Sequence, residues 1–111
     1  LALQQACREI YVHPELQRYM VALIHATRKH PGAANGVSPR GTLALLRASQ
    51  AHAMVCGRSY VVPEDIKTIA DPVLSHRITL AAGTDHFRAA SRIIGEILSS
   101  TTVPTENWAE R

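Results

Sequence analysis

Apolar residues recur every three or four positions along most of this chain, which is the spacing of a helix with one buried face. The clearest example follows Pro14, where Leu16, Met20, Leu23 and Thr27 fall on one side. The same period predicts helices over residues 1–9, 14–30, 39–56, from 63 onward, and over 87–99. The pattern therefore predicts an all-α fold, a small bundle of about four to five helices.

Prolines and glycines mark the ends of these helices. Pro14, Pro39 and Pro63 each stand at an expected first helical residue, where the N–H that proline lacks would have no partner. Gly57 can end the third helix in a left-handed conformation, and Pro72 is expected to end or kink the fourth. The remainder is two very short extended segments at residues 10–12 and 58–62, a loop at 31–38 and a linker at 79–85.

The third helix is apolar on most of its circumference, which is typical of a helix in the centre of a core. Its apolar positions fall on two sides, one with Leu43, Leu46, Ala53 and Met54 and the other with Ala44, Ala48, Ala51 and Val55. We therefore expect this helix to lie among the others. Its many alanines would let neighbouring elements approach closely.

The composition fits one domain with a modest core. The chain has 111 residues, of which 46% are apolar and 19% charged, and these values do not indicate disorder. A formal net charge of +3 is too small to predict binding to nucleic acid or to a membrane surface. No apolar run approaches the ~20 residues of a membrane-spanning helix. Because Leu1 is not a methionine and enters a helical pattern at once, we expect the chain to be part of a longer protein.

Two cysteines and six histidines raise the question of a metal site. His52 and Cys56 are four residues apart, so they fall on one face of the third helix, as two metal ligands could. A structural zinc site needs four ligands, and His25 and His30 lie elsewhere without a matching spacing. We therefore expect no metal, a packed histidine, and reduced, buried thiols at Cys7 and Cys56, as in a cytoplasmic protein.

The sequence carries no motif for catalysis. It contains neither the G-x-S-x-G turn of hydrolases nor the G-x-x-x-x-G-K-[ST] loop that cradles nucleotide phosphates. We therefore expect that this chain alone is not an enzyme and does not hold a nucleoside triphosphate. Two alternatives stay open: a basic helical module that binds nucleic acid, although its cations are scattered, and a metal-dependent or histidine-based enzyme.

The start of the third helix carries the strongest candidate for binding. In NGVSPRG, residues 35–41, Ser38 can cap the helix through its hydroxyl, and Pro39 sets the backbone. Arg40 is then the second helical residue, where a cation opposes the helix dipole at a cost of about 0.3–1 kcal/mol. A bound anion would remove that cost. Spacing alone favours a solvated surface arginine over this functional interpretation.

A longer series of motifs surrounds Arg40. GVSPRGTLALLRASQAHAMVCGRSYVVPEDIKTIADPVLSHRI, residues 36–78, contains S-P-R, a Leu- and Ala-rich helix, G-R-x-Y-V, P-x-D-I and V-L-x-H-R-I in order. In this order and spacing it resembles the C-terminal lid domain of MoxR-family AAA+ ATPases, and residues 11–31 resemble the preceding part. Two positions depart from the family pattern. Val62 replaces a hydroxyl-bearing N-cap, so Asp65 is expected to reach back to a free N–H, and Gly41 replaces Ala or Ser.

The resemblance implies an AAA+ lid over residues 1–100 and a flexible tail over residues 101–111, with the ATPase core upstream. It gives Arg40 the role of the sensor 2 arginine, which contacts ATP bound in the core, with Ser38 and Pro39 beside it at the nucleotide. ATP and Mg²⁺ would then belong to the full-length protein, an ATP hydrolase, and neither is expected in this chain alone.

The family also implies partners. They are the protein's own AAA+ core, the neighbouring subunits of a homo-oligomeric ring, and von Willebrand factor A-type proteins, on which such ATPases act as chaperone-like machines. His76 and Arg77 are candidates for a subunit contact or for simple solvation. Because a lid packs on a core, we expect uncovered apolar surface around Leu3 and Ile10 or around residues 60–62.

Overall fold

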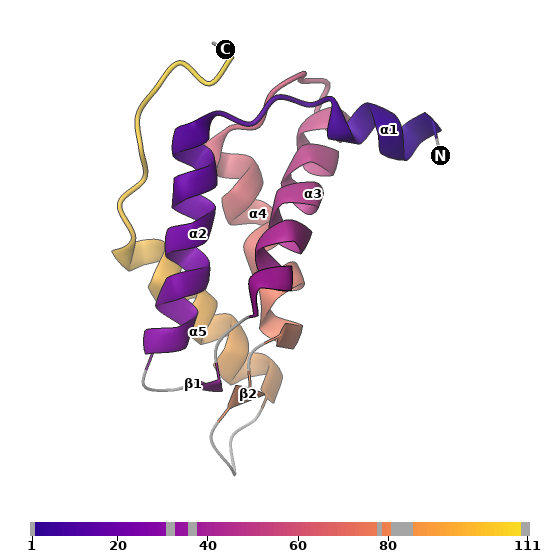
Figure 1. Ribbon diagram of the computed structural model, residues 1–111. Helices are drawn as coiled ribbons and strands as arrows, with labels where there is room; N and C mark the ends of the chain where they lie inside the picture. The colour runs from indigo at the N-terminus through magenta and orange to yellow at the C-terminus, as the bar shows by residue number, and fades with distance from the viewer. Residues whose placement is uncertain (1, 31–32, 36–37, 78, 81–85, 110–111) are drawn as a thin grey trace.

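The computed structural model describes the chain except for residues 1, 31–32, 36–37, 78, 81–85 and 110–111. The described part is all-α, as predicted. Its helices are α1 (Ala2–Arg8), α2 (Pro14–Lys29), α3 (Pro39–Val55), α4 (Pro63–Leu74), a 3₁₀ turn η1 (Ser75–Arg77) and α5 (His86–Ser100). Figure 1 shows α2, α3, α4 and α5 gathered into a bundle, while α1 projects to one side at the end where α3 finishes.

The helix ends follow the predicted punctuation. Pro14, Pro39 and Pro63 each occupy the first turn of a helix, and Gly57 follows α3 with a left-handed φ of 80°. The prediction for Pro72 is only half right, because α4 continues past it to Leu74 before the 3₁₀ turn. Proline removes a single N–H at this point, and the helix tolerates that loss so close to its end.

The two extended segments predicted at residues 10–12 and 58–62 meet in the structure. Tyr11 and Tyr60 form an isolated parallel bridge, in which the Tyr11 N–H donates to the Ser59 carbonyl and the Val61 N–H donates to the Tyr11 carbonyl, both at 2.9 Å. A second pairing lies where a loop and a linker were predicted. It joins β1 (Ala33–Asn35) to β2 (Thr79–Leu80) as an antiparallel pair. Pairs this short are set by the helices that bring them together rather than by their own sequence.

The core forms where the inner faces of the four long helices meet. Its most enclosed large side chains, each less than 2% exposed, include Leu16, Met20, Leu23, Leu45, Ile66, Leu74 and Ile94. Val61, from the second extended segment, is also fully buried. The core therefore draws on every long helix, and the amphipathic face predicted for α2 is the face that it buries.

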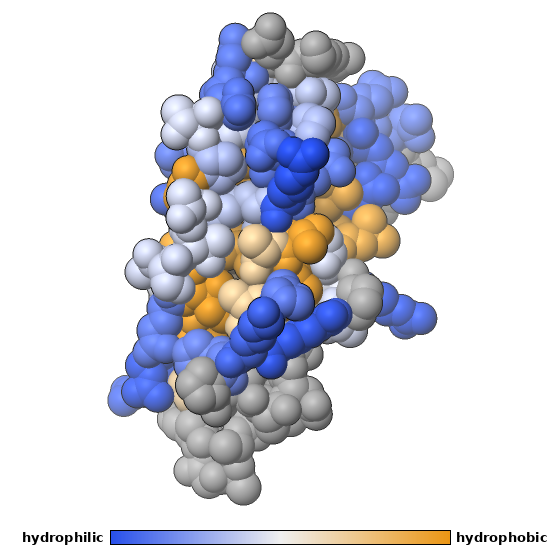
Figure 2. Space-filling view, turned by 60° about the vertical axis from the view of Figure 1, so that its left-hand side comes forward, coloured by the Kyte–Doolittle hydropathy of each residue, from blue (hydrophilic) through white to orange (hydrophobic). Residues whose placement is uncertain are grey.

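One side of α3 differs from the prediction. Leu45 and Ala53 are fully buried, but Leu43 is 54% and Val55 87% exposed. The helix is apolar on most of its circumference, yet the described elements leave Leu43, near its start, and Val55, its last residue, largely uncovered. This domain therefore leaves apolar side chains of α3 exposed. On the side of α2, which Figure 2 brings forward, apolar side chains also lie between hydrophilic ones across the middle of the face.

The most exposed apolar side chains lie elsewhere than predicted. Ile10 packs against the core, Val61 is buried within it, and the Leu3 side chain lies outside the described residues. Among the residues whose side chains the structure describes, the large apolar ones that are exposed are Val21, Leu43 and Val55. In residues 60–62 only Val61 is fully buried, while Tyr60 and Val62 are half-buried, because the bridge to Tyr11 draws the segment against the bundle.

Two leucines on α3 offer a matched test of this arrangement. Replacing Leu45 with alanine removes a fully buried side chain, so the free energy of unfolding should fall by about 2–5 kcal/mol. The same change at the exposed Leu43 should cost less than about 1 kcal/mol. Urea unfolding followed by circular dichroism measures both values, and equal losses would contradict the assignment of the two faces.

Candidate functional site

Ser38 and Pro39 begin α3. Ser38 holds the N-cap position with an extended backbone, but its side chain forms no hydrogen bond with the helix, so the predicted hydroxyl cap is wrong. The Ser38 carbonyl instead accepts the Gly41 N–H at 2.8 Å, which closes the first turn through the backbone alone. The Ser38 side chain stays exposed to solvent, where water satisfies the hydroxyl at no cost to the helix.

Arg40 is the second residue of α3, and its side chain is exposed. Within the part of the chain that the structure describes, no residue pairs with its guanidinium, and the first turn of α3 contains no acidic residue. The N–H groups of that turn already carry a partial positive charge. The guanidinium adds to this field, so the start of α3 favours an anion supplied from outside the domain.

A buried ion pair lies at the opposite end of α3. Asp65, in the first turn of α4, is fully buried, and its two carboxylate oxygens accept bonds from Arg58 at 2.6 and 2.7 Å. The Val62 N–H donates to Oδ2 at 2.8 Å, and Nδ1 of His52 lies 2.6 Å from Oδ1. Because an ionised carboxylate only accepts, Nδ1 of His52 carries the shared proton. The carboxylate thus joins the first turn of α4 to the last turn of α3 through His52, and to the turn that follows α3 through Arg58.

This environment shifts the ionisation of both partners. Burial acts to raise the pKa of Asp65, but the hydrogen bonds from Arg58, the Val62 N–H and His52 outweigh burial and hold the pKa below its usual value. The pKa of Arg58 is raised, chiefly by its hydrogen bond to Asp65. Asp65 is therefore a carboxylate, and Arg58 a cation, at neutral pH.

His52, Cys56 and Asp65 bring three ligand-type atoms within 4.8 Å of one another. Cys56 Sγ lies 3.8 Å from Nδ1 of His52. Each oxygen of Asp65, however, already accepts two hydrogen bonds, and the guanidinium of Arg58 occupies the side that a cation would approach. A metal ion would have to displace Arg58 and the proton of His52, so the cluster is better suited to holding two helices together.

The cysteines are less buried than predicted. Both are free thiols, with Cys7 half-buried and Cys56 exposed. Cys7 Sγ lies 3.3 Å from Sδ of Met54, which places α1 against the second half of α3. Cys56 is the C-cap residue of α3, where the helix ends at the surface of the bundle.

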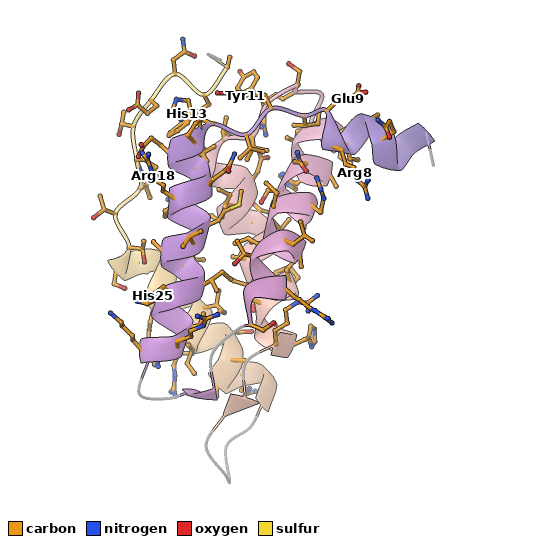
Figure 3. All side chains as sticks on the ribbon, in the orientation of Figure 1. Arg8, Glu9, Tyr11, His13, Arg18 and His25 are labelled. Carbon is orange, nitrogen blue, oxygen red and sulfur yellow. The ribbon has the colours of Figure 1, made fainter. Side chains whose placement is uncertain are left out.

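The other candidate histidines do not form one site. His25 is exposed on α2 (Figure 3), and Nε2 of His30 lies 2.6 Å from a carboxylate oxygen of Glu96, linking the end of α2 to α5. His76 and Arg77 are exposed in the 3₁₀ turn, and their role at a subunit contact stays a prediction.

Sequence reasoning found part of the buried pair and missed the rest. The prediction that Asp65 reaches back to a free N–H is confirmed by its bond to Val62. The pairing with Arg58 and His52 was not predicted. The available signal was a lone arginine and a lone aspartate seven residues apart on either side of the turn that joins two helices.

Comparison with known proteins gives the class of the domain. A family model described as the AAA lid domain matches residues 25–97, so the chain belongs to the AAA lid domain family. Its relatives place it, more narrowly, with the lid domains of MoxR-family AAA+ ATPases. It is 37% identical to YeaC of Bacillus subtilis over 98% of this chain and 32% identical to chaperone MoxR1 of Mycobacterium tuberculosis over 96%.

A solved structure supports the same class. A crystal structure of a candidate ATPase from Cytophaga hutchinsonii superposes on 91% of this chain with a TM-score of 0.82 at 28% identity. The chain spans about a third of each relative, namely 34% of YeaC, 31% of MoxR1 and 34% of the Cytophaga protein. Among the described helices, none has the length and hydropathy needed to cross a lipid bilayer.

The buried pair predicts how stability depends on pH. Because the pKa of Asp65 is lowered by folding, its contribution is complete above its unfolded pKa of about 3.9 and is lost as the pH falls through the lower folded value. Asp65→Asn should cost about 2–4 kcal/mol at pH 7 and flatten the decline in melting temperature below about pH 4. Glu64→Gln, the exposed neighbour, is the control. A decline that is as steep in Asp65→Asn as in the unmodified chain would contradict the assignment.

Proposed function

We propose that this domain is the lid of a MoxR-type AAA+ ATPase and that Arg40 is its sensor 2 arginine. In this role Arg40 contacts ATP bound in the ATPase core of the full-length protein. The observation that carries the proposal is the state of Arg40, exposed at a helix N-terminus and without a partner among the described residues. Family membership supports the same role, because the S-P-R sequence at residues 38–40 lies within the matched lid region.

The chemistry of the α3 N-terminus suits a triphosphate. A guanidinium presents a planar fork of N–H donors that can bind two phosphate oxygens at once. The N–H groups of the first turn add a fixed partial positive charge. The Ser38 hydroxyl is exposed and is not used as a helix cap, so it can donate to a phosphate oxygen. Pro39 restrains the backbone between these two donors.

We propose that Arg40 couples the nucleotide to the position of the lid. A guanidinium forms stronger hydrogen bonds with bound ATP, whose γ-phosphate is present, than with the nucleotide that remains after that phosphate has left. The free energy of those bonds therefore favours one lid position while ATP is bound. This preference is lost after hydrolysis. Mg²⁺ would accompany ATP in the core, and this chain supplies no carboxylate near Arg40 in its first turn to bind it.

We propose further that the full-length protein hydrolyses ATP as a homo-oligomeric ring in the cytoplasm and remodels partner proteins in a chaperone-like manner. The name of the Mycobacterium relative, chaperone MoxR1, supports remodelling. Von Willebrand factor A-type proteins are the proposed partners.

Substitution of Arg40 in the full-length protein tests this function. Arg40→Ala should lower the rate of ATP hydrolysis by about ten- to a hundredfold, since a hydrogen bond to a charged group contributes about 1.5–3 kcal/mol. The rate of Arg40→Lys should lie between those of the unmodified protein and Arg40→Ala, because lysine keeps the charge but loses the planar set of N–H donors. Arg92→Ala removes an exposed arginine of α5 and should leave the rate unchanged. Turnover by Arg40→Ala equal to that of the unmodified protein would exclude the sensor role.

A further inference from the structure

The C-terminal segment, residues 101–109, returns along the bundle after α5. Thr101 closes α5, since its N–H and its hydroxyl both donate to the Ile97 carbonyl, at 3.0 and 2.7 Å. The chain then runs beside α2 toward the end at which that helix begins (Figure 1). Thr102 and Pro104 line a shallow groove together with residues of α2, among them Tyr19.

Two apolar side chains attach this segment. Val103 and Trp108 are partly buried and pack against the core. The Trp108 ring meets the His13 ring edge to face, with centroids 5.5 Å apart and planes at 89°. Between residues 102–109 and the described helices there is no backbone–backbone hydrogen bond. The attachment therefore depends on side chains, and such a segment can detach without unfolding the helices.

His13 links this segment to the connection between α1 and α2. Its Nδ1 accepts the Glu15 N–H at 3.0 Å and so caps α2. Its ring also lies 6.4 Å from the ring of Tyr11, whose backbone is bonded to the segment around Tyr60. Figure 3 shows Tyr11 and His13 at the start of α2, beside the C-terminal segment.

We propose that residues 101–109 form a releasable strap that fixes residues 9–13, the connection between α1 and the bundle. The connection is held by the backbone bridge between Tyr11 and Tyr60, by Gln50 of α3, whose Nε2 donates to the Ile10 carbonyl at 2.9 Å, and by Trp108 against His13. Detachment of Trp108 removes the ring contact with His13 and leaves the connection held by the Tyr60 bridge and by Gln50. Any chain that precedes α1 would then gain freedom to turn relative to the lid. The proposal does not depend on the role of Arg40.

Hydrogen–deuterium exchange in the full-length protein, resolved by peptide mass spectrometry, tests the strap. Trp108→Ala should raise the exchange rate of amides in residues 9–13 about tenfold, because their opening no longer requires removal of an aromatic contact. His13→Asn keeps a side-chain acceptor for the first turn of α2 but loses the ring. It should raise exchange in residues 9–13 as Trp108→Ala does, without loosening the rest of α2.

Thr105→Ala is the matched control, because Thr105 is exposed in the same segment and should change nothing. Unchanged exchange over residues 9–13 in Trp108→Ala would overturn the proposal. Equal acceleration across α2, α4 and α5 would also overturn it, because Trp108 would then be an ordinary core residue. The rate of ATP hydrolysis by Arg40→Ala is a separate measurement, so the two proposals can fail independently.

Discussion

The fully buried carboxylate of Asp65 is the constraint on which the geometry of this domain depends. It is enclosed by a guanidinium, a backbone N–H and an imidazole N–H, so its charge is compensated within the protein. Removing any one of these donors would leave the charge of a fully buried carboxylate less compensated, which costs free energy. The last turn of α3 and the first turn of α4 are therefore held at a single relative position.

This restraint matters at the other end of α3. The helix has 17 residues and spans about 25 Å, and a helix of that length transmits a fixed direction from one end to the other. With its C-terminal turn tied to Asp65 and its inner face packed in the core, α3 presents Arg40 at a defined place on the surface. A side chain that must reach a phosphate on another domain needs such a support, since a displacement of 1 Å can remove a hydrogen bond.

The extended segment that contains Tyr11 forms a second point of convergence. It receives the bridge from Tyr60, precedes the His13 cap of α2, and lies beside the C-terminal segment through His13 and Trp108. Residues from three distant parts of the sequence thus hold the passage from α1 into the bundle. This passage is held by a few hydrogen bonds and one ring contact, whereas the core beneath is broad and apolar. We therefore expect the passage to open more readily than the core.

Much of the candidate site could be predicted from local sequence. The S-P-R sequence placed Arg40 in a first helical turn, since proline there sets the backbone and has no N–H to lose. The absence of a hydroxyl at Val62 indicated that Asp65 would reach back. The sequence could not show that the Ser38 hydroxyl would stay unused as a cap. Either the carbonyl or the hydroxyl of Ser38 can accept an N–H of the first turn, and which of them does so depends on the direction from which the preceding chain enters the helix.

The sequence by itself determined the helices, their ends and the class of fold, because helical period, proline and glycine act over a few residues. Tertiary structure alone decided which side of α3 is covered. It also decided that the Asp65 carboxylate pairs with Arg58 and His52 and that Trp108 lies against His13. Each of these depends on the angle at which separate helices pack. That angle is set by the sum of many side-chain contacts across the core, and no short stretch of sequence contains it.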